Sequence, residues 1–292
     1  MAVSILSAEH PDLVAYYTMS NIVGSTLVDE TGNYPGVIVG ATQVADGTGH
    51  ALDFNGSAGY VKVPIAAGSP LDAPAAMAVE IEFTLRDTAD ECLFSRYAAS
   101  NLDTQMYIAP GNGFVWRKAN TAASVAAAIP GLSKTHAVGQ YNGAVWEIFV
   151  EGQKVAEAGS TLKMASNAEP LLIGTDADAT NAGSLGNWLN GKINKIRFFK
   201  RTLTPAEIVE LYEERLPYTV AGTILQDAVP LAAQARIYDA ATGELVDTVV
   251  SDSSGVYQKN LPTAADVYVM VVPNSGYRPL IHGPINPALR YP

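Results

Sequence analysis

Cysteine, basic residues and long apolar runs are scarce in this sequence of 292 residues. The single cysteine, Cys92, excludes a disulfide framework, and with four scattered histidines it leaves no cluster of soft metal ligands. Eighteen lysines and arginines face 29 aspartates and glutamates, so the net charge of −11 would repel a nucleic-acid backbone. No apolar run reaches the length of about 18 residues that a membrane helix needs. We therefore predict neither a nucleic-acid partner nor membrane insertion.

The N-terminus lacks the features of a secretory signal peptide. Its first residues carry no basic flank, and their apolar stretch stops at Ser7. A signal peptide needs a positive end and an apolar run of about 7–15 residues. We expect the chain to be made and folded in a reducing cytoplasm, which agrees with its lone cysteine.

Alternating apolar and polar residues dominate the first 200 positions, a pattern typical of β-strands with one buried face. Residues 77–85 show it most clearly, and further strands are expected at 13–17, 60–64, 146–150 and 192–199. On one side of the 77–85 strand the pattern places Met77, Val79, Ile81, Phe83 and Leu85, and on the other Glu80, Glu82 and Thr84. Turns rich in glycine and asparagine separate these strands. The sequence therefore predicts an antiparallel β-sandwich.

A helix is expected directly after this strand-rich region. Thr204 suits its N-cap, Pro205 its first position and Glu207 the third, which together form a capping box. Pro217 ends the helix. We place a domain boundary here, with one domain at 1–218 and a second at 219–292.

The second domain repeats the all-β pattern on a smaller scale. Strands are expected at 220–225, 234–238, 245–250 and 267–272, separated by polar turns. From Pro273 the chain is rich in proline, and we expect an ordered but irregular or extended tail with a partner surface as one possible role.

An ordered series of motifs in residues 13–215 resembles the laminin-G-like, concanavalin A-like lectin/glucanase superfamily. The motifs are LVAYY at 13–17, DETGN at 29–33, GHALDFNG at 49–56, YVKVP at 60–64, THAV at 135–138, FVEG at 149–152, LIG at 172–174, LNGKINKIR at 189–197 and LTPAEI at 203–208. The resemblance implies a two-sheet jelly roll, usually a module that binds sugars or proteins and less often a glycosidase.

The resemblance also implies a calcium ion at one rim of the sandwich, held by acidic side chains. Asn55 and Asn194 stand where the family commonly has aspartate. An amide oxygen is neutral and is a weaker ligand for a hard cation. We therefore assign no calcium and predict no cofactor.

Residues 219–292 resemble the small transthyretin-like, or carboxypeptidase-regulatory-like, β-sandwich. The residues that carry this resemblance are AGTI at 221–224, ARIYD at 235–239, TGELV at 242–246 and SDSSGVY at 251–257. With a tail such as LIHGPI at 280–285, this domain looks like the ends of tail and baseplate proteins of tailed bacteriophages. The expected fold is thus all-β, a concanavalin A-like jelly roll plus a small immunoglobulin- or transthyretin-like sandwich, with one short helix between them.

Glu80 and Glu82 are candidates for a glycosidase pair, because alternation places both on one face of a strand. A retaining mechanism needs two carboxyl groups about 5–5.5 Å apart. The family's catalytic strand has a third acidic position, which here is Thr84. The favoured interpretation is that both glutamates lie on the water-exposed face of an antiparallel sheet.

A long polar stretch at 176–188 precedes the late strand and is the candidate ligand site. Asp176, Asp178 and Asn187 could hydrogen-bond to sugar hydroxyls, and Trp188 could stack on a pyranose ring. The alternative, which the residues favour, is a connection whose Trp188 anchors the next strand in the core.

These observations predict a non-enzymatic structural or interaction protein of a bacteriophage virion, located in the tail or baseplate or associated with the capsid. Its lectin-like domain would contact other virion proteins or the host surface, and the chain would form a homo-oligomer within the particle. The alternative is an adhesion module that recognises bacterial surface glycans. A glycan hydrolase that uses Glu80 and Glu82 is the third hypothesis.

Overall fold

The computed structural model describes most of the chain and divides it into two compact units, Met1–Leu211 and Tyr212–Pro292. The described residues are 3–47, 49–72, 74–98, 101–109, 113–118, 124–159, 166, 169–177, 185–216, 218–226, 229–261, 265–272, 280–285 and 287–289. Strands dominate both units, which confirms the predicted all-β class. In the described part of the chain, no helix has the length and apolar character needed to cross a bilayer.

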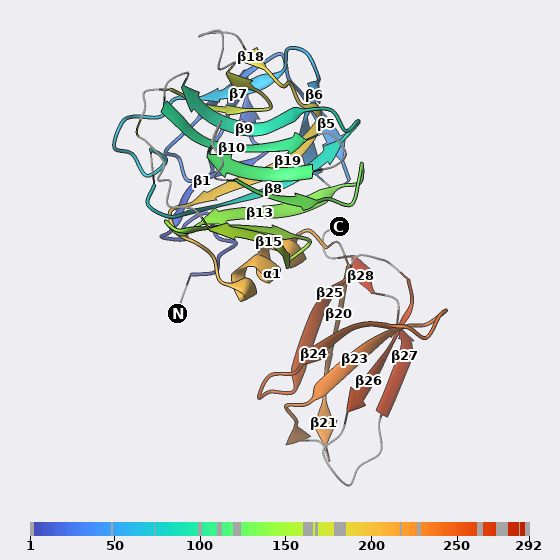
Figure 1. The fold of residues 1–292 in the computed structure, drawn as a ribbon. Coiled ribbons are helices and arrows are strands. Elements are labelled where there is room, and N and C mark those ends of the chain that lie inside the picture. The colour runs from blue at the N-terminus through green and yellow to red at the C-terminus, as the bar shows by residue number, and fades with distance from the viewer. Residues whose placement is uncertain are drawn as a thin grey trace. The chain divides into compact units, whose positions relative to one another are not determined.

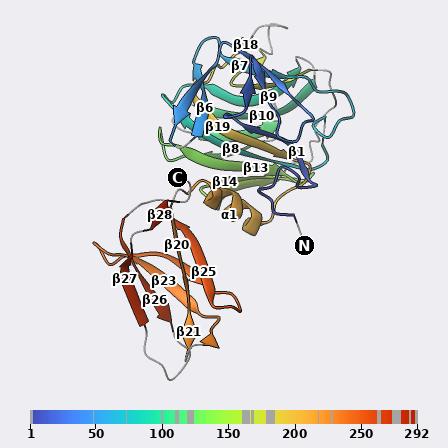
Figure 2. The same cartoon turned by 180° about the vertical axis from the view of Figure 1, so that it is seen from behind.

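Two antiparallel sheets form the first unit (Figures 1 and 2). We call the first sheet A; its order is β15-β14-β13-β8-β19-β6-β5, with β1 also paired to β19. Its strands are β1 (Leu13–Thr18), β5 (Thr42–Asp46), β6 (Gly49–Asn55), β8 (Met77–Leu85), β13 (Thr135–Tyr141), β14 (Val145–Val150), β15 (Gln153–Gly159) and β19 (Asn190–Phe199).

The second sheet, sheet B, has the order β12-β11-β10-β9-β16-β7-β4-β3-β2. Its strands are β2 (Ile22–Val23), β3 (Thr26–Leu27), β4 (Gly36–Val39), β7 (Tyr60–Val63), β9 (Glu91–Ala98), β10 (Asn101–Ala109), β11 (Gly113–Lys118), β12 (Ser124–Ala128) and β16 (Leu171–Ile173). A short hairpin of β17 (Asp176–Ala177) and β18 (Leu185–Gly186) lies beyond β16. The core between the sheets is aromatic, with buried Phe54, Phe83, Phe94, Phe114, Trp116 and Trp146.

Strand β8 has the predicted bounds, and its predicted apolar face lies in this core. The expectation that the opposite face meets water is wrong, because Glu80 and Glu82 are both buried. Helix α1 (Pro205–Glu214) and the N-terminal residues cover this outer face of sheet A. Their contact is an apolar cluster of Ile5, Leu13, Ala78, Val138, Phe149, Phe199, Leu203, Ile208 and Leu211.

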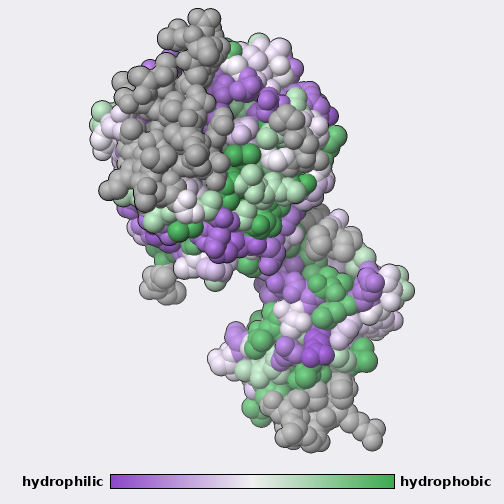
Figure 3. Space-filling view, in the orientation of Figure 1, coloured by the Kyte–Doolittle hydropathy of each residue, from purple (hydrophilic) through white to green (hydrophobic). Residues whose placement is uncertain are grey.

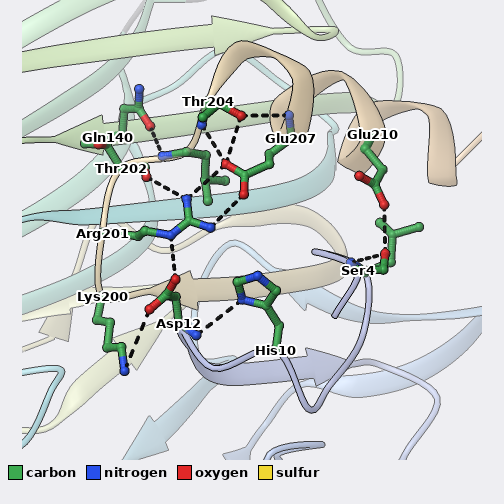
Figure 4. A network of polar contacts seen from close by, with 12 residues as sticks. Ser4, His10, Asp12, Gln140, Lys200, Arg201, Thr202, Thr204, Glu207 and Glu210 are labelled. Atoms are coloured by element: carbon green, nitrogen blue, oxygen red, sulfur yellow. Dashed lines mark hydrogen bonds and ion pairs between the residues drawn. The ribbon is translucent and has the colours of Figure 1, made fainter. Parts of the chain in front are cut away.

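Polar contacts fasten α1 to the rest of the unit (Figure 4). The predicted capping box is present, since Glu207 accepts the Thr204 backbone N–H at 2.7 Å and Thr204 Oγ1 accepts that of Glu207 at 3.3 Å. The Arg201 guanidinium donates to both Glu207 carboxylate oxygens, at 2.9 and 2.6 Å, and to Asp12 at 2.6 Å. This arginine lowers the pKa of Glu207 to about 2. It therefore joins the helix to the segment before β1.

The second unit is a smaller β-sandwich. One sheet has the order β25-β20-β28 and the other β24-β23-β26-β27. Its strands are β20 (Tyr218–Thr223), β23 (Gln234–Asp239), β24 (Leu245–Val250), β25 (Val256–Leu261), β26 (Val267–Val272), β27 (Leu280–Ile285) and β28 (Ala288–Leu289), with a small β21 (Leu225–Gln226) and β22 (Val229–Pro230) pair. Their core includes Val220, Ala235, Ile237, Val267 and Val269.

The predicted strands of the second unit lie close to their expected positions, and its proline-rich end contains more structure than expected. Residues 280–285 form β27, which pairs with β26, where the sequence indicated an irregular or extended tail. Residues 273–279 lie outside the described part of the chain.

Candidate functional site

Contacts at one rim of the first unit bring together residues from β7, β10 and β17 and the residues that join β18 to β19. Figure 1 labels β7 and β18 at this rim. We call residues 187–190 the rim segment. It contains Asn187 and Trp188, two of the residues that the sequence singled out.

A polar cluster occupies this rim. Asp176 Oδ2 accepts hydrogen bonds from Gln105 Nε2 at 2.6 Å and from Asn187 Nδ2 at 3.0 Å. Asp176 is only 7% exposed, whereas Asn187 is exposed. The carboxylate thus holds the two amides in place, and the Asn187 amide is the member of the cluster that solvent reaches. Asp178 lies outside the described residues.

An aromatic pair adjoins the cluster. The ring centroids of Trp188 and Tyr60 lie 6.1 Å apart with their planes tilted by 57°. Both side chains are partly exposed, and it is the next residue, Leu189, that is buried in the core at 1% exposure. The interpretation of Trp188 as the core anchor of β19 is therefore wrong. Leu189 anchors the strand, and Trp188 is left at the rim.

Main-chain hydrogen bonds fix the rim segment to the sandwich. The Cys92 N–H donates to the Asn187 carbonyl at 2.8 Å, and the Leu189 N–H donates to the Gly174 carbonyl at 3.0 Å. Thr175 Oγ1 donates to the carbonyl of Gly186 at 2.7 Å. Asn187 adopts a φ of 44°, in the left-handed region that asparagine tolerates better than most residues. Hydrogen bonds within the first unit thus hold the main chain of the rim segment in place.

Such an arrangement suits recognition of a hydroxyl-rich ring. The Asn187 amide can donate and accept hydrogen bonds in one plane. Beside it, Trp188 offers a flat apolar face with a polar edge, and Tyr60 supports that ring. A partly apolar surface with a few fixed polar groups is the usual composition of a small-molecule site.

Two members of the site, Tyr60 and Gln105, were not among the predicted site residues. Tyr60 opens the YVKVP motif, which predicts a strand but no binding role. Gln105 lies on β10, a strand that was not predicted from the sequence. Because the contacts join residues 71 and 128 positions apart, no local pattern could have revealed them.

The glycosidase candidates have a different environment. Glu80 is fully buried, with Arg197 at 2.8 Å and Lys195 and His136 each at 3.3 Å. Burial alone would raise the pKa of Glu80, but Arg197 and Lys195 outweigh it and hold the pKa far below its ordinary value. The Glu82 carboxylate lies 3.2 Å from Lys134. Both carboxylates are thus buried beside cationic side chains.

Asn55 offers no free oxygen to the calcium ion that the family resemblance implies. Its Oδ1 accepts the backbone N–H groups of Ser57 and Ala58, each at 3.1 Å, so it caps a turn. Asn194 donates its amide to Asp46 at 2.7 Å, and its buried Oδ1 accepts no hydrogen bond from the described residues. Across the described ranges, no three histidine, cysteine, aspartate or glutamate side chains are grouped to hold a metal.

The two-sheet fold of the first unit is that of a lectin-like β-sandwich. A family model described as the concanavalin A-like lectin/glucanases superfamily matches residues 55–209, and the chain belongs to this family. This confirms the resemblance of the first unit. No curated protein matches the chain.

Solved structures share this fold at low sequence identity. Domain 4 of AbnA, an extracellular arabinanase of Geobacillus stearothermophilus solved with arabinotriose, is 16% identical with a TM-score of 0.53, covering 69% of this chain and 98% of that domain. The binding domain of botulinum neurotoxin DC, solved with SialylT, is 9% identical with a TM-score of 0.56, covering 90% and 72%. Trypanosoma rangeli sialidase with sialic acid is 15% identical with a TM-score of 0.54, and the match covers 70% of this chain and 33% of the sialidase.

Proposed function

We propose that this chain is a glycan-binding module whose first unit recognises a sugar at the rim. The observation that carries the proposal is the partly exposed Trp188, supported by Tyr60 beside the fixed Asp176, Asn187 and Gln105 cluster. The family supports this proposal, as do two of the matched structures, one solved with arabinotriose and one with SialylT.

We further propose that the module binds without cleaving. Glu80 and Glu82 are both buried, with Arg197 2.8 Å from Glu80 and Lys134 3.2 Å from Glu82, so in this proposal they do not supply the acid and nucleophile of a retaining glycosidase. Reducing-sugar release that a Glu82→Gln variant lacks would contradict this part of the proposal.

An array of arabino-oligosaccharides, sialylated oligosaccharides and bacterial surface glycans tests binding directly. We expect Trp188→Ala to weaken the best array signal more than about tenfold, because an aromatic anchor commonly carries much of a binding energy. Trp188→Phe should retain part of the signal. Asn187→Gly, which keeps the left-handed backbone but removes the amide, should weaken binding as well. A wild-type protein that binds no array glycan at millimolar concentration would refute the proposal.

An assembly role for the second unit is a separate candidate, favoured by exposed apolar side chains on the β24-β23-β26-β27 sheet. Val250, Ile281 and Leu245 are 66%, 62% and 55% exposed. Figure 3 shows hydrophobic residues gathered on the visible surface of this unit. Placement in a phage virion stays a prediction, and mass spectrometry of intact particles tests it. Detection of the protein only in the soluble lysate would count against it.

A further inference from the structure

An exposed lysine, Lys62, lies two residues after Tyr60 on strand β7. Residues two apart on a strand lie on the same face of a sheet, with Cα atoms about 6.6 Å apart. Lys62 and Tyr60 therefore share the outer face of sheet B, while Val61 and Val63 face the other way and are buried in the core. Tyr60 in turn contacts Trp188. A positive charge thus lies close to the aromatic pair of the rim.

Lys62 forms no ion pair with any residue in the described part of the chain. The other lysines with described side chains each lie within 3.8 Å of a carboxylate; they are Lys134, Lys154, Lys192, Lys195, Lys200 and Lys259. On the two strands beside β7, the residues paired with Lys62 are both apolar, Val37 on β4 and Leu172 on β16. In a chain with a net charge of −11, this lysine is thus left for a negative group from outside.

The position of Lys62 in the sheet does not account for its charge. Lysines often lie on edge strands, where they prevent pairing with another chain. Strand β7 is an inner strand of sheet B, between β16 and β4. On β4, Val37 and Val39 are 47% and 40% exposed, and Val39 is paired with Tyr60. Lys62 therefore lies in a partly apolar surface that continues from the aromatic pair.

The polar cluster of the rim lies on another part of sheet B. Gln105, which binds Asp176, is on β10, and β9 and β16 separate this strand from β7. The Asp176 carboxylate is buried and accepts hydrogen bonds from the amides of Gln105 and Asn187. The carboxylate and the lysine thus belong to opposite sides of β16. A ligand that extends from Trp188 over β7 meets the lysine.

We propose that the glycan bound at the rim is anionic, and that the negative group of an acidic sugar pairs with Lys62 while a sugar ring stacks on Trp188. The inference rests on the proposed function, because it names the class of glycan that the same site takes. An ammonium group carries three donors on a flexible stem, so it can follow a carboxylate or a phosphate. Hydrogen bonds between charged partners are roughly twice as strong as neutral ones. Lys62 is therefore the residue that determines specificity, and Trp188 contributes affinity for charged and neutral glycans alike.

Anionic glycans compared with neutral counterparts of the same size test the charge of the ligand. The array carries sialylated, uronic acid-containing and phosphate-bearing oligosaccharides, which separates carboxylate from phosphate, and the full chain is used. We expect the wild type to bind at least one anionic glycan about fivefold or more tightly than its neutral counterpart. This preference should shrink as the salt concentration rises from about 0.05 to 0.5 M, because salt screens exposed charges.

Lys62→Gln should lose this preference and keep the binding of neutral glycans, whereas Lys62→Arg, which retains the charge, should keep the preference. Lys154→Gln is the matched control, because it removes the same charge from β15 in sheet A. We expect it to behave as the wild type. Far-UV circular dichroism reports folding of every variant.

Equal binding of anionic and neutral glycans by the wild type, or a preference that Lys62→Gln leaves unchanged, would overturn this inference. If Trp188→Ala weakens binding in that case, the proposed function stands. Binding of anionic glycans that Trp188→Ala leaves unchanged would show that the rim is not the site and would overturn both proposals. The absence of binding to any glycan would also overturn both.

Discussion

Gly174 shows how a single residue can shape the rim. It adopts a φ of 87°, and a Cβ atom at this position would collide with the ring of Phe54 in the core. Its carbonyl also accepts the N–H of Leu189, inside the rim segment. The absence of a side chain thus lets the chain turn between β16 and β17 while the core remains closely packed.

We expect Gly174→Ala to lower the free energy of unfolding by about 2–4 kcal/mol, since backbone strain and overpacking act together. Gly47→Ala is the control, because Gly47 has a φ of 64° with open space around it, and it should cost about 1 kcal/mol. Urea denaturation measures both. Equal losses in the two variants would mean that the Phe54 contact contributes nothing.

Some residues of the candidate site could be predicted from the sequence, and others could not. The polar composition at 176–188 pointed to Asp176 and Asn187, and the structure joins them. The composition could not reveal that Trp188 lies at the rim while Leu189 is buried. Either of these two adjacent residues can fill a core position, and only the packing of the folded strands determines which one does. Tyr60 and Gln105 come from distant strands, so their place in the site depends on tertiary structure.

Helix α1 packs on the outer face of sheet A and contributes to the burial of that face. The alternation of β8 correctly predicted which residues face the core. It could not show that the polar face is covered, because the cover comes from distant parts of the chain, the N-terminal residues and helix α1. Buried Glu80 is tolerated there because Arg197, stacked 4.0 Å over the Tyr16 ring, and Lys195 neutralise it.

The ion pair between Arg201 and Glu207, which fastens α1, should make the stability of the first unit decrease in acid. Because Arg201 and the Thr204 cap lower the pKa of Glu207 to about 2, this carboxylate contributes its full stabilisation above about pH 5 and loses it as the pH falls towards 2. We expect Glu207→Gln to lose about 2 kcal/mol at pH 7, allowing for partial solvent screening, and less at pH 3. Chemical denaturation across this pH range measures the difference. Glu9→Gln, on the exposed surface, should show no such trend.

A second acid-sensitive contact joins β5 to β19. Burial would raise the pKa of Asp46, but hydrogen bonds from Lys134, Asn194 and Lys192 lower it to about 2. Asp46→Asn should therefore destabilise the protein at pH 7 by about 1–2 kcal/mol, and the loss should shrink as the pH falls below 4. A loss that does not depend on pH would show that packing, rather than charge, makes the contribution.

At the scale of the whole molecule, each unit has a hydrophobic core of its own. The clusters of the first unit draw on residues between Ile5 and Leu211, and that of the second on residues between Tyr218 and Ile285. We expect a chain ending at residue 216 to fold and to retain the array binding of the full protein, and calorimetry of the full chain to show two transitions. One cooperative transition, or a truncated chain that does not fold, would contradict this expectation.

The covering of sheet A by α1 also has an evolutionary consequence. One face of the sandwich is committed to internal salt bridges and helix packing, where substitutions endanger the fold. The partly exposed rim side chain of Trp188 lies outside this packing, so substitutions there should disturb the scaffold less. Mutational tolerance should therefore be greater at this position, where, under the proposed function, a substitution changes which glycan is bound.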